Sequence, residues 1–293
     1  KHTFKNARDF NQTLSWDTGL VTDMSGTFAG AVSYNKAISW DTDNVTTFAH
    51  MFESASSFDS SLTIDTPSAT TLEGMFKDAS SFNQPIEFSD ISFVQTMKSM
   101  FEGAFNFNED FLFDGSQFGG VSDTSFMFKG ARAYGFGRTP GQPGGVDEWH
   151  TGNVFTMESM FEDTDFFNTN LVRVSVYNWN TANVQNMSKM FKNATSFTGY
   201  EFTPTDGIAN WVTLNVSDMS EMFSGASSFN ASLVAAPTPA GGIWRTDAVT
   251  TMRQMFSGST TFNQDISSWE VSNVEYMTEM FYGADNFNQN LGS

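Results

Sequence analysis

The feature that most constrains this chain is a repeat anchored on an aromatic residue. Phenylalanine occurs 32 times in 293 residues, at regular rather than scattered positions. The anchors are Phe4, Phe28, Phe52, Phe76, Phe101, Phe128, Phe161, Phe191, Phe223, Phe256 and Phe281. Their spacings are 24, 24, 24, 25, 27, 33, 30, 32, 33 and 25 residues. Such a period is typical of an array of stacked repeats, so we expect a single repeat domain over residues 1–293.

Further columns keep a fixed distance from the anchor. An aromatic residue follows six positions later, and a small residue, usually Ala, follows three positions later. Seven repeats carry Trp twelve positions before the anchor, and these account for every tryptophan in the chain: Trp16, Trp40, Trp149, Trp179, Trp211, Trp244 and Trp269. One repeat is too small to bury a core alone, so these columns should become interior rows when repeats stack.

The spacing inside a repeat predicts a short helix. Apolar or small residues stand at −7, −4, −1, 0 and +3 from the anchor, as in Val274, Met277, Met280, Phe281 and Ala284. This three-or-four spacing is that of one helical face. Gly two positions after the anchor suits the exit of such a helix.

A brief strand is expected after the second aromatic residue, where the chain is too short and polar for another helix. An Ile or Leu there should point inward, at Leu14, Ile38, Leu62, Ile86, Leu171, Leu233, Ile266 and Leu291. We therefore predict an α/β fold, a right-handed solenoid of leucine-rich-repeat type. It should have about ten rungs, each a short parallel strand plus a short helix.

The most complete copy of the repeat runs from Val249 to Trp269. It reads Val-x-x-Met-x-x-Met-Phe-x-x-Ala-x-x-Phe-Asn-Gln-x-Ile-x-x-Trp, and only Ser259, in place of Ala, departs. The pattern resembles the BspA-like leucine-rich repeats of surface proteins, a variant also found in mycoplasma lipoproteins. The resemblance implies an extracellular or cell-surface protein used in adhesion or protein binding, without catalytic residues. Departures from the pattern occur at Ser116, Thr124 and Gly135.

Charge and composition exclude several classes of partner. A net charge of −19 would repel nucleic acid and anionic membranes. Solubility explains the acidity most simply, with divalent cations or basic partners as alternatives. The absence of cysteine rules out disulfides and thiolate metal sites. No run of about 18 apolar residues occurs, so direct membrane insertion is not expected.

Residues for catalysis or metal binding are few. His2, His50 and His150 are the only histidines and are widely separated in the repeat. Acidic residues are plentiful, but no pair is singled out for acid–base chemistry. We expect no enzyme activity and no cofactor. An acidic column at Asp17, Asp41 and Asp65 offers weak calcium candidates, but later repeats break the column, which favours solvated charges instead.

Asparagine recurs seven positions after the anchor, at Asn11, Asn35, Asn83, Asn108, Asn168, Asn230, Asn263 and Asn288. A ladder that satisfies backbone groups is one interpretation, because interior polar groups need partners. A row of ligand-binding amides is the other. Six glycosylation sequons begin at Asn11, Asn44, Asn186, Asn193, Asn215 and Asn230, and they permit N-glycosylation without demonstrating it.

The repeat lengthens between about residues 112 and 243, where enlarged loops are expected to emerge on one side. Aromatic and arginine residues dominate binding hot spots, so this region suggests a recognition patch. Its candidates are Phe136, Arg138, Arg173, Tyr177, Tyr200 and Phe202. Tolerated surface drift is the alternative, because loops accept insertions at little cost.

Two functions fit these features. The first is an extracellular or cell-surface scaffold for adhesion or for binding a protein or glycan. The second is a structural subunit that stacks end to end into a fibre, filament or sheath. Phe4 opens within a repeat and Leu291 ends within one, so neither end looks like a polar cap. Either the chain is cut from a longer protein, or another copy covers its ends.

Overall fold

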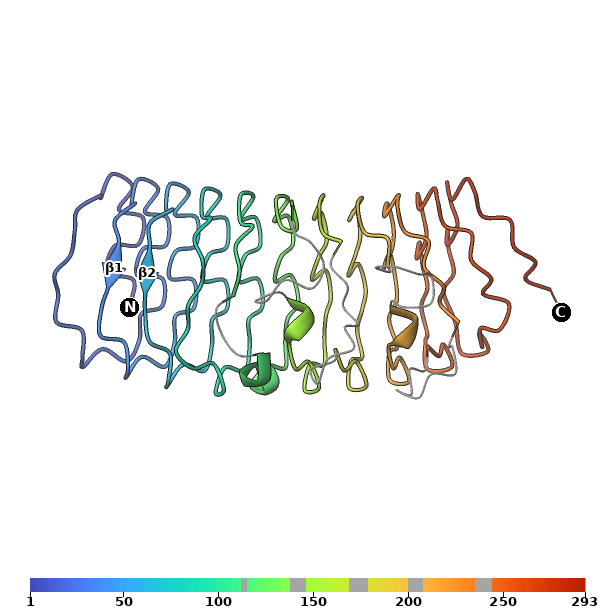
Figure 1. Ribbon diagram of the computed structural model, residues 1–293, viewed down its shortest axis with the longest axis horizontal. Coiled ribbons are helices and arrows are strands. Elements are labelled where there is room, and N and C mark those ends of the chain that lie inside the picture. Colours follow the sequence, from blue (N-terminus) through green and yellow to red (C-terminus); the bar gives the residue numbers. More distant parts are fainter. Residues whose placement is uncertain (112–114, 138–145, 169–178, 200–207, 235–243, 293) are drawn as a thin grey trace.

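The computed structural model describes residues 1–111, 115–137, 146–168, 179–199, 208–234 and 244–292. In these residues each repeat makes one coil, and successive coils lie side by side along an elongated molecule (Figure 1). Hydrogen bonds confirm this stacking. The N–H of Phe28, for example, donates to the carbonyl oxygen of Met51 in the next repeat, at 2.8 Å.

Regular secondary structure is sparse. Strand β1 (Ile38–Ser39) pairs in parallel with β2 (Leu62–Thr63), and the 3₁₀ helices are η1 (Gly115–Gly120), η2 (Val146–Glu148) and η3 (Ile208–Asn210). No α-helix occurs among the residues that the structure describes. The predicted α/β solenoid, with a helix and a strand in every rung, is therefore wrong.

The predicted helix fails because every repeat places two residues in the left-handed region. They stand two positions before and two positions after the anchor, as His50 (φ 57°) and Ser54 (φ 58°) do around Phe52. An α-helix needs an unbroken run of right-handed residues. Consecutive tight turns occupy the segment instead, with N–H of Ala55 bonded to the carbonyl of Phe52 at 3.0 Å. These turns reproduce the three-or-four spacing of a helical face.

Backbone groups of these turns pair with the next coil. The N–H groups of His50, Phe52 and Ser54 donate to the carbonyls of the following repeat at 2.8, 2.8 and 2.7 Å. A row of isolated parallel bridges runs beside them, from Asp23–Thr47 to Thr251–Tyr276. Buried backbone groups need partners. Because each coil finds many of them in its neighbours, it depends on the stack.

The aromatic columns form interior rows, as the repeat predicts. Phe52 stacks on Phe76 of the next coil, with ring centroids 5.6 Å apart and planes 3° apart. Phe52 also stacks on Phe58 in its own coil at 4.1 Å. All three rings are fully buried. The inward strand positions Ile38 and Ile86 are buried too.

The coil around Ser116 departs from the repeat but keeps an aromatic core. Ser116 occupies the tryptophan position and is exposed. Helix η1 instead brings Phe118 into the interior, where its ring stacks on Trp149 with centroids 4.3 Å apart. Phe111 meets Trp149 edge to face at 5.1 Å. Thr124, another departure, is buried, and its hydroxyl donates to the carbonyl of Thr156 at 3.2 Å.

Candidate functional site

Three exposed phenylalanines and one arginine form two pairs where the repeats begin to lengthen. Phe105, Phe136 and Phe166 are 50%, 62% and 45% exposed. The rings of Phe136 and Phe166 meet edge to face, with centroids 4.9 Å apart and planes at 73°. The guanidinium carbon of Arg132, also exposed, lies 6.0 Å from the centroid of the Phe105 ring. We call these four residues the aromatic patch.

Asn108 fixes the turn that presents Phe136. Its Oδ1 accepts a hydrogen bond from the N–H of Gly135, and its Nδ2 donates to the carbonyl of Phe136, both at 2.8 Å. The N–H of Phe136 donates to the carbonyl of Ala133 at 2.9 Å, and Ala133 in turn bonds the carbonyl of Phe105 at 3.1 Å. A surface held this way loses little conformational entropy when a partner binds.

Gly135 allows the two Phe rings of the patch to meet. It replaces the Asn of the repeat and has φ of 97°. A Cβ atom at Gly135 would lie 2.7 Å from the carbonyl oxygen of Phe166 and 2.9 Å from Cα of Phe167, too close for any side chain. The replacement of Asn by Gly in the sequence therefore marks the close approach of Phe136 and Phe166.

Sequence reasoning located only part of this patch. Phe136 was among the predicted recognition residues, and it lies in the patch. The other five lie outside the described residues, so their prediction and that of the loop cluster stay untested: Arg138, Arg173, Tyr177, Tyr200 and Phe202. Phe105, Arg132 and Phe166 were missed because they occupy regular positions of the repeat, outside the insertions. The available signal was that Phe105 stands where earlier repeats carry Ser56 and Ser80.

The asparagine column is a backbone-satisfying ladder. Oδ1 of Asn11 accepts from the N–H of Asn35 at 3.0 Å, and Oδ1 of Asn83 accepts from the N–H of Asn108 at 2.8 Å. Asp59 takes the same role toward Asn83 at 2.9 Å. The structural interpretation is confirmed for these residues. The Oδ1 atoms of these side chains already accept backbone hydrogen bonds, which disfavours a row of ligand-binding amides.

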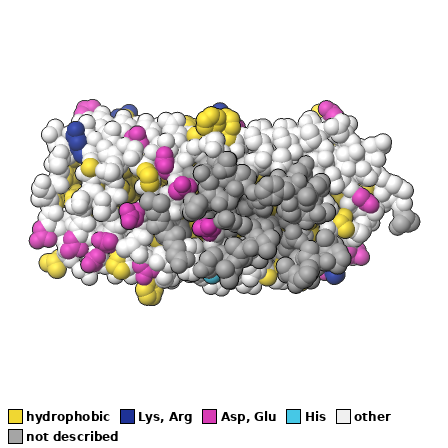
Figure 2. Space-filling model, in the orientation of Figure 1, with side chains coloured by type: hydrophobic (Ala, Val, Ile, Leu, Met, Phe, Trp, Pro, Cys, Tyr) yellow, Lys and Arg dark blue, Asp and Glu magenta, His cyan; other side chains and the backbone are white. Residues whose placement is uncertain are grey.

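The weak calcium candidates lie on exposed positions of successive coils. Oδ1 of Asp17 accepts from the N–H of Gly19 at 3.2 Å, and Oδ1 of Asp41 accepts from the N–H of Asp43 at 3.3 Å, so both close local turns. Asp65 is exposed. On the visible face most acidic side chains lie on the left half of the molecule (Figure 2). Within the described part of the chain, no three His, Asp or Glu side chains are grouped to hold a metal ion.

The sequon asparagines differ in accessibility. Asn44, Asn193 and Asn215 are exposed, whereas the other three are half-buried: Asn11, Asn186 and Asn230. Nδ2 of Asn44 donates to the carbonyl of Gly19 at 2.8 Å, and Nδ2 of Asn215 donates to that of Ala182 at 2.7 Å. The atom that would carry a glycan thus already links two coils at these sites. Glycosylation stays a prediction.

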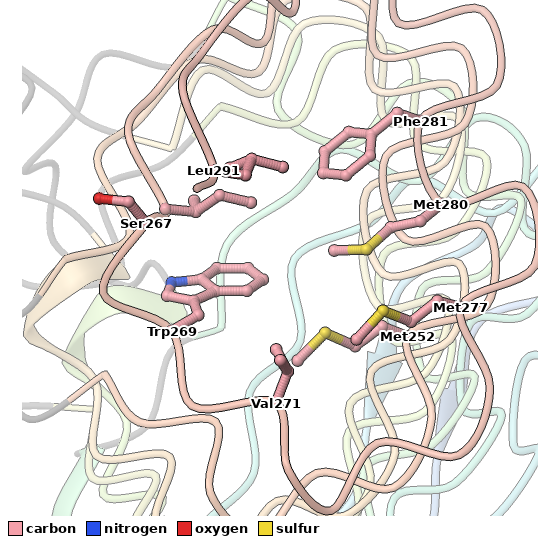
Figure 3. Close-up of a pocket in the computed structure, with 9 residues that line it drawn as sticks. Met252, Ser267, Trp269, Val271, Met277, Met280, Phe281 and Leu291 are labelled. Carbon is pink, nitrogen blue, oxygen red and sulfur yellow. The ribbon is translucent and has the colours of Figure 1, made fainter. Parts of the chain in front are cut away.

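The last coil lines a half-open apolar pocket of about 180 Å³. Trp269 and Leu291 face Met280 and Phe281 across it (Figure 3). Its remaining lining residues are Met252, Ile266, Ser267, Val271 and Met277. In interior coils the corresponding space is filled by the buried Met, Phe and Trp columns of the next repeat.

In the first and last described coils, some of the backbone groups that pair between interior coils have no partner. Among the described residues, the N–H groups of Phe281 and Gly283 have no acceptor, and the carbonyls of Thr3 and Lys5 have no donor. Between interior coils, equivalent groups pair, as the N–H of Phe256 does with the carbonyl of Met280 at 2.9 Å. The C-terminal end thus offers donors at the positions where the N-terminal end offers acceptors.

Stacked coils joined by backbone and side-chain ladders define a repeat protein. In the part of the chain that the structure describes, no helix is long and apolar enough to cross a membrane. The sequence matches the family described as "Mycoplasma protein of unknown function, DUF285" over residues 1–64, 39–139, 117–203 and 199–293. The chain belongs to this family. No curated protein and no solved structure matches it.

Proposed function

We propose that this chain is a non-catalytic binding scaffold, located at the cell surface or outside the cell, that holds a protein or glycan partner on the aromatic patch. The observation that carries the proposal is the exposed Phe136–Phe166 ring pair on a fixed turn, with Arg132 four residues before Phe136 and over the Phe105 ring. Aromatic residues, Phe included, and Arg are enriched at protein interfaces, and Arg is also frequent among the few residues that dominate binding energy. Exposed phenylalanines that lie in contact therefore favour a recognition role over surface drift.

The proposed location rests on the resemblance to BspA-like repeats, which occur in surface proteins. Antibody labelling of intact cells of the source organism tests it directly. Labelling before permeabilisation is the expected result. Labelling that requires permeabilised cells would contradict a surface location.

Binding is tested with a variant that removes all three rings of the patch, F105A/F136A/F166A. Arrays of glycans and of extracellular proteins are screened with the wild-type chain. We expect at least one bound partner that the variant no longer binds. The matched control is F93A/F155A, since Phe93 and Phe155 are 64% and 50% exposed but have no ring contact with the patch among the described residues. Equal binding by wild type and the patch variant would sink the proposal.

End-to-end stacking is a second candidate function, because the backbone groups of the first and last described coils are complementary. A second copy that continued the stack could pair its Thr3 and Lys5 carbonyls with the N–H groups of Phe281 and Gly283. Oδ1 of Asn288 would accept from the N–H of Asn11 of that copy, as Oδ1 of Asn263 does from Asn288 at 2.9 Å. A head-to-tail contact of this kind does not close on itself, so it would produce filaments.

Sedimentation across a range of protein concentrations tests the stacking proposal. We expect elongated assemblies that grow with concentration. Replacing Met277, 41% exposed at the open end, with Lys should shift the chain toward monomers, because a charge would be buried at the contact. The control R253K changes an exposed residue of an interior coil. Wild-type chain that stays monomeric at every concentration would count decisively against stacking.

A further inference from the structure

We infer that the aromatic patch takes a protein segment that carries one carboxylate beside an apolar side chain, rather than a carbohydrate. This inference rests on the proposed binding function and specifies the chemistry of its partner. It follows from the shape of the Phe136–Phe166 pair, from the unpaired charge of Arg132, and from the charge of the whole chain.

The shape of the ring pair favours an apolar side chain. Phe136 and Phe166 meet at 73° with centroids 4.9 Å apart, so their faces form a notch instead of one flat platform. A sugar ring stacks along a flat aromatic face, whereas a branched or aromatic side chain can enter a notch and contact both rings. Phe also lacks a polar atom that could receive sugar hydroxyls, and a hydroxyl buried without a partner is costly.

Arg132 supplies a charge that no carboxylate of the described residues neutralises. Several lysines are paired with a carboxylate of a neighbouring coil: Lys77 with Glu102 at 2.7 Å, Lys129 with Glu162 at 2.9 Å, and Lys192 with Glu221 at 2.5 Å. Arg132 has no ion pair within the described residues and lies over the Phe105 ring. Its guanidinium can therefore bind a carboxylate through two parallel hydrogen bonds while keeping its contact with the ring.

The overall charge limits how acidic the partner can be. With a net charge of −19, the chain repels a run of acidic residues as it approaches. A single carboxylate next to an apolar group satisfies Arg132 and keeps this repulsion small. The partner segment that fits best therefore pairs Asp or Glu with a neighbouring Leu, Ile, Met or Phe.

Selection from random peptides displayed on phage tests the inference with the whole chain as target. Enriched peptides should share one Asp or Glu next to a large apolar residue. A synthetic consensus peptide, followed by fluorescence anisotropy, should bind about tenfold more weakly or worse to F136A and R132E. R132K should lose part of the affinity, because Lys lacks the planar fork of Arg. The control F93A should bind like wild type.

A double-mutant cycle separates the ion pair from a general loss of surface. Changing the acidic peptide residue to its amide should cost as much affinity as R132A, and combining both changes should cost no more than either alone. Enriched peptides without an acidic residue, or full affinity of R132E, would overturn the inference.

A glycan array run in parallel keeps the two proposals apart. A glycan that binds the wild-type chain but not F136A would overturn the inference about a protein segment and leave the binding scaffold intact. If neither peptides nor glycans bind the wild type better than F105A/F136A/F166A, both proposals fail.

Discussion

The anchors Phe4 to Phe101 are 24 or 25 residues apart, whereas those from Phe128 to Phe256 are 30 to 33 apart, yet the two regions share one core. Ring centroids of Phe52 and Phe76 lie 5.6 Å apart in the short coils, and those of Phe191 and Phe223 lie 5.8 Å apart in the long ones. The N–H of the anchor bonds the next coil at 2.8 Å from Phe52 and at 2.9 Å from Phe191. The added residues thus leave the contacts between coils unchanged.

The regions differ in what surrounds the core. In the short coils the asparagine ladder is continuous from Asn11 to the N–H of Gly135. Gly135 and Thr198 interrupt it in the long coils, and the aromatic patch begins at the first interruption. The ring core is therefore the same in both regions, whereas the side chain at the ladder position changes where the aromatic patch begins.

Removing an anchor ring should have the largest effect, and the same effect in both regions. Phe52 and Phe223 are both fully buried. Each change to Ala leaves a cavity and should cost about 3–5 kcal/mol of unfolding free energy. Urea denaturation followed by tryptophan fluorescence measures the cost. A much smaller loss for F223A than for F52A would show that the long coils are packed less well.

Two glycines of one column should respond unequally to the same change. Gly103 and Gly130 have φ of 70° and 71°, so Ala is strained at both, by roughly 1–2 kcal/mol. A Cβ at Gly103 would also lie 2.3 Å from Oδ1 of Asp78, whereas at Gly130 the nearest atom is 3.7 Å away. Thermal melting should therefore place G103A below G130A. Equal melting temperatures would mean that the Asp78 side chain turns away from the added methyl group at no cost.

The asparagine ladder should contribute alike in short and long coils. Oδ1 of Asn83 accepts the N–H of Asn108 at 2.8 Å, and Oδ1 of Asn230 accepts the N–H of Asn263 at 2.9 Å. Changing either to Ala should cost about 1 kcal/mol in urea denaturation, because a backbone N–H loses its acceptor. N83D is the control, since Asp59 already fills this role. Loss of stability in N83D as large as in N83A would argue against the ladder.

The smallest effect concerns acid stability in the short coils. Hydrogen bonds from Ser25 and Ser92 lower the pKa of Asp23 and Asp90, respectively. Since each folded pKa lies below the unfolded value near 4, the stabilisation is complete above that value and is lost as the pH falls through the folded pKa. D23N/D90N should lose less stability than wild type on acidification. Identical melting curves of the two proteins from neutral to acidic pH would contradict this.

The buried aromatic positions could be predicted from the sequence, but the backbone conformation around each anchor could not. Buried rings at a fixed offset identify an interior row in any stacked repeat. The apolar spacing around Phe52 fits a helix and consecutive tight turns equally. The two differ in the left-handed residues, such as His50 and Ser54, and neither His nor Ser indicates a positive φ in a sequence. Gly at the same positions in other repeats, such as Gly74 and Gly103, was the available clue.

Polar ladders and the patch were harder to foresee. The buried hydroxyl of Thr42 donates to the carbonyl of Asp65 at 2.7 Å, and Thr246 does the same toward Glu270. Threonine next to acidic residues looks exposed in a sequence, so this ladder was missed. Phe166 looked like one more aromatic residue beside the buried Phe167, and only coordinates separate the exposed ring from the interior one.

In every repeat, tight turns with two left-handed residues take the place of a helix and bond to a neighbouring coil. Nuclear magnetic resonance tests it most directly, through φ-sensitive couplings at His50 and Ser54 and hydrogen-bond couplings between coils. We predict positive φ at both residues and a coupling from the N–H of Phe52 to the carbonyl of Met75. Helical φ values across residues 46–55, with bonds to the fourth preceding residue, would contradict it.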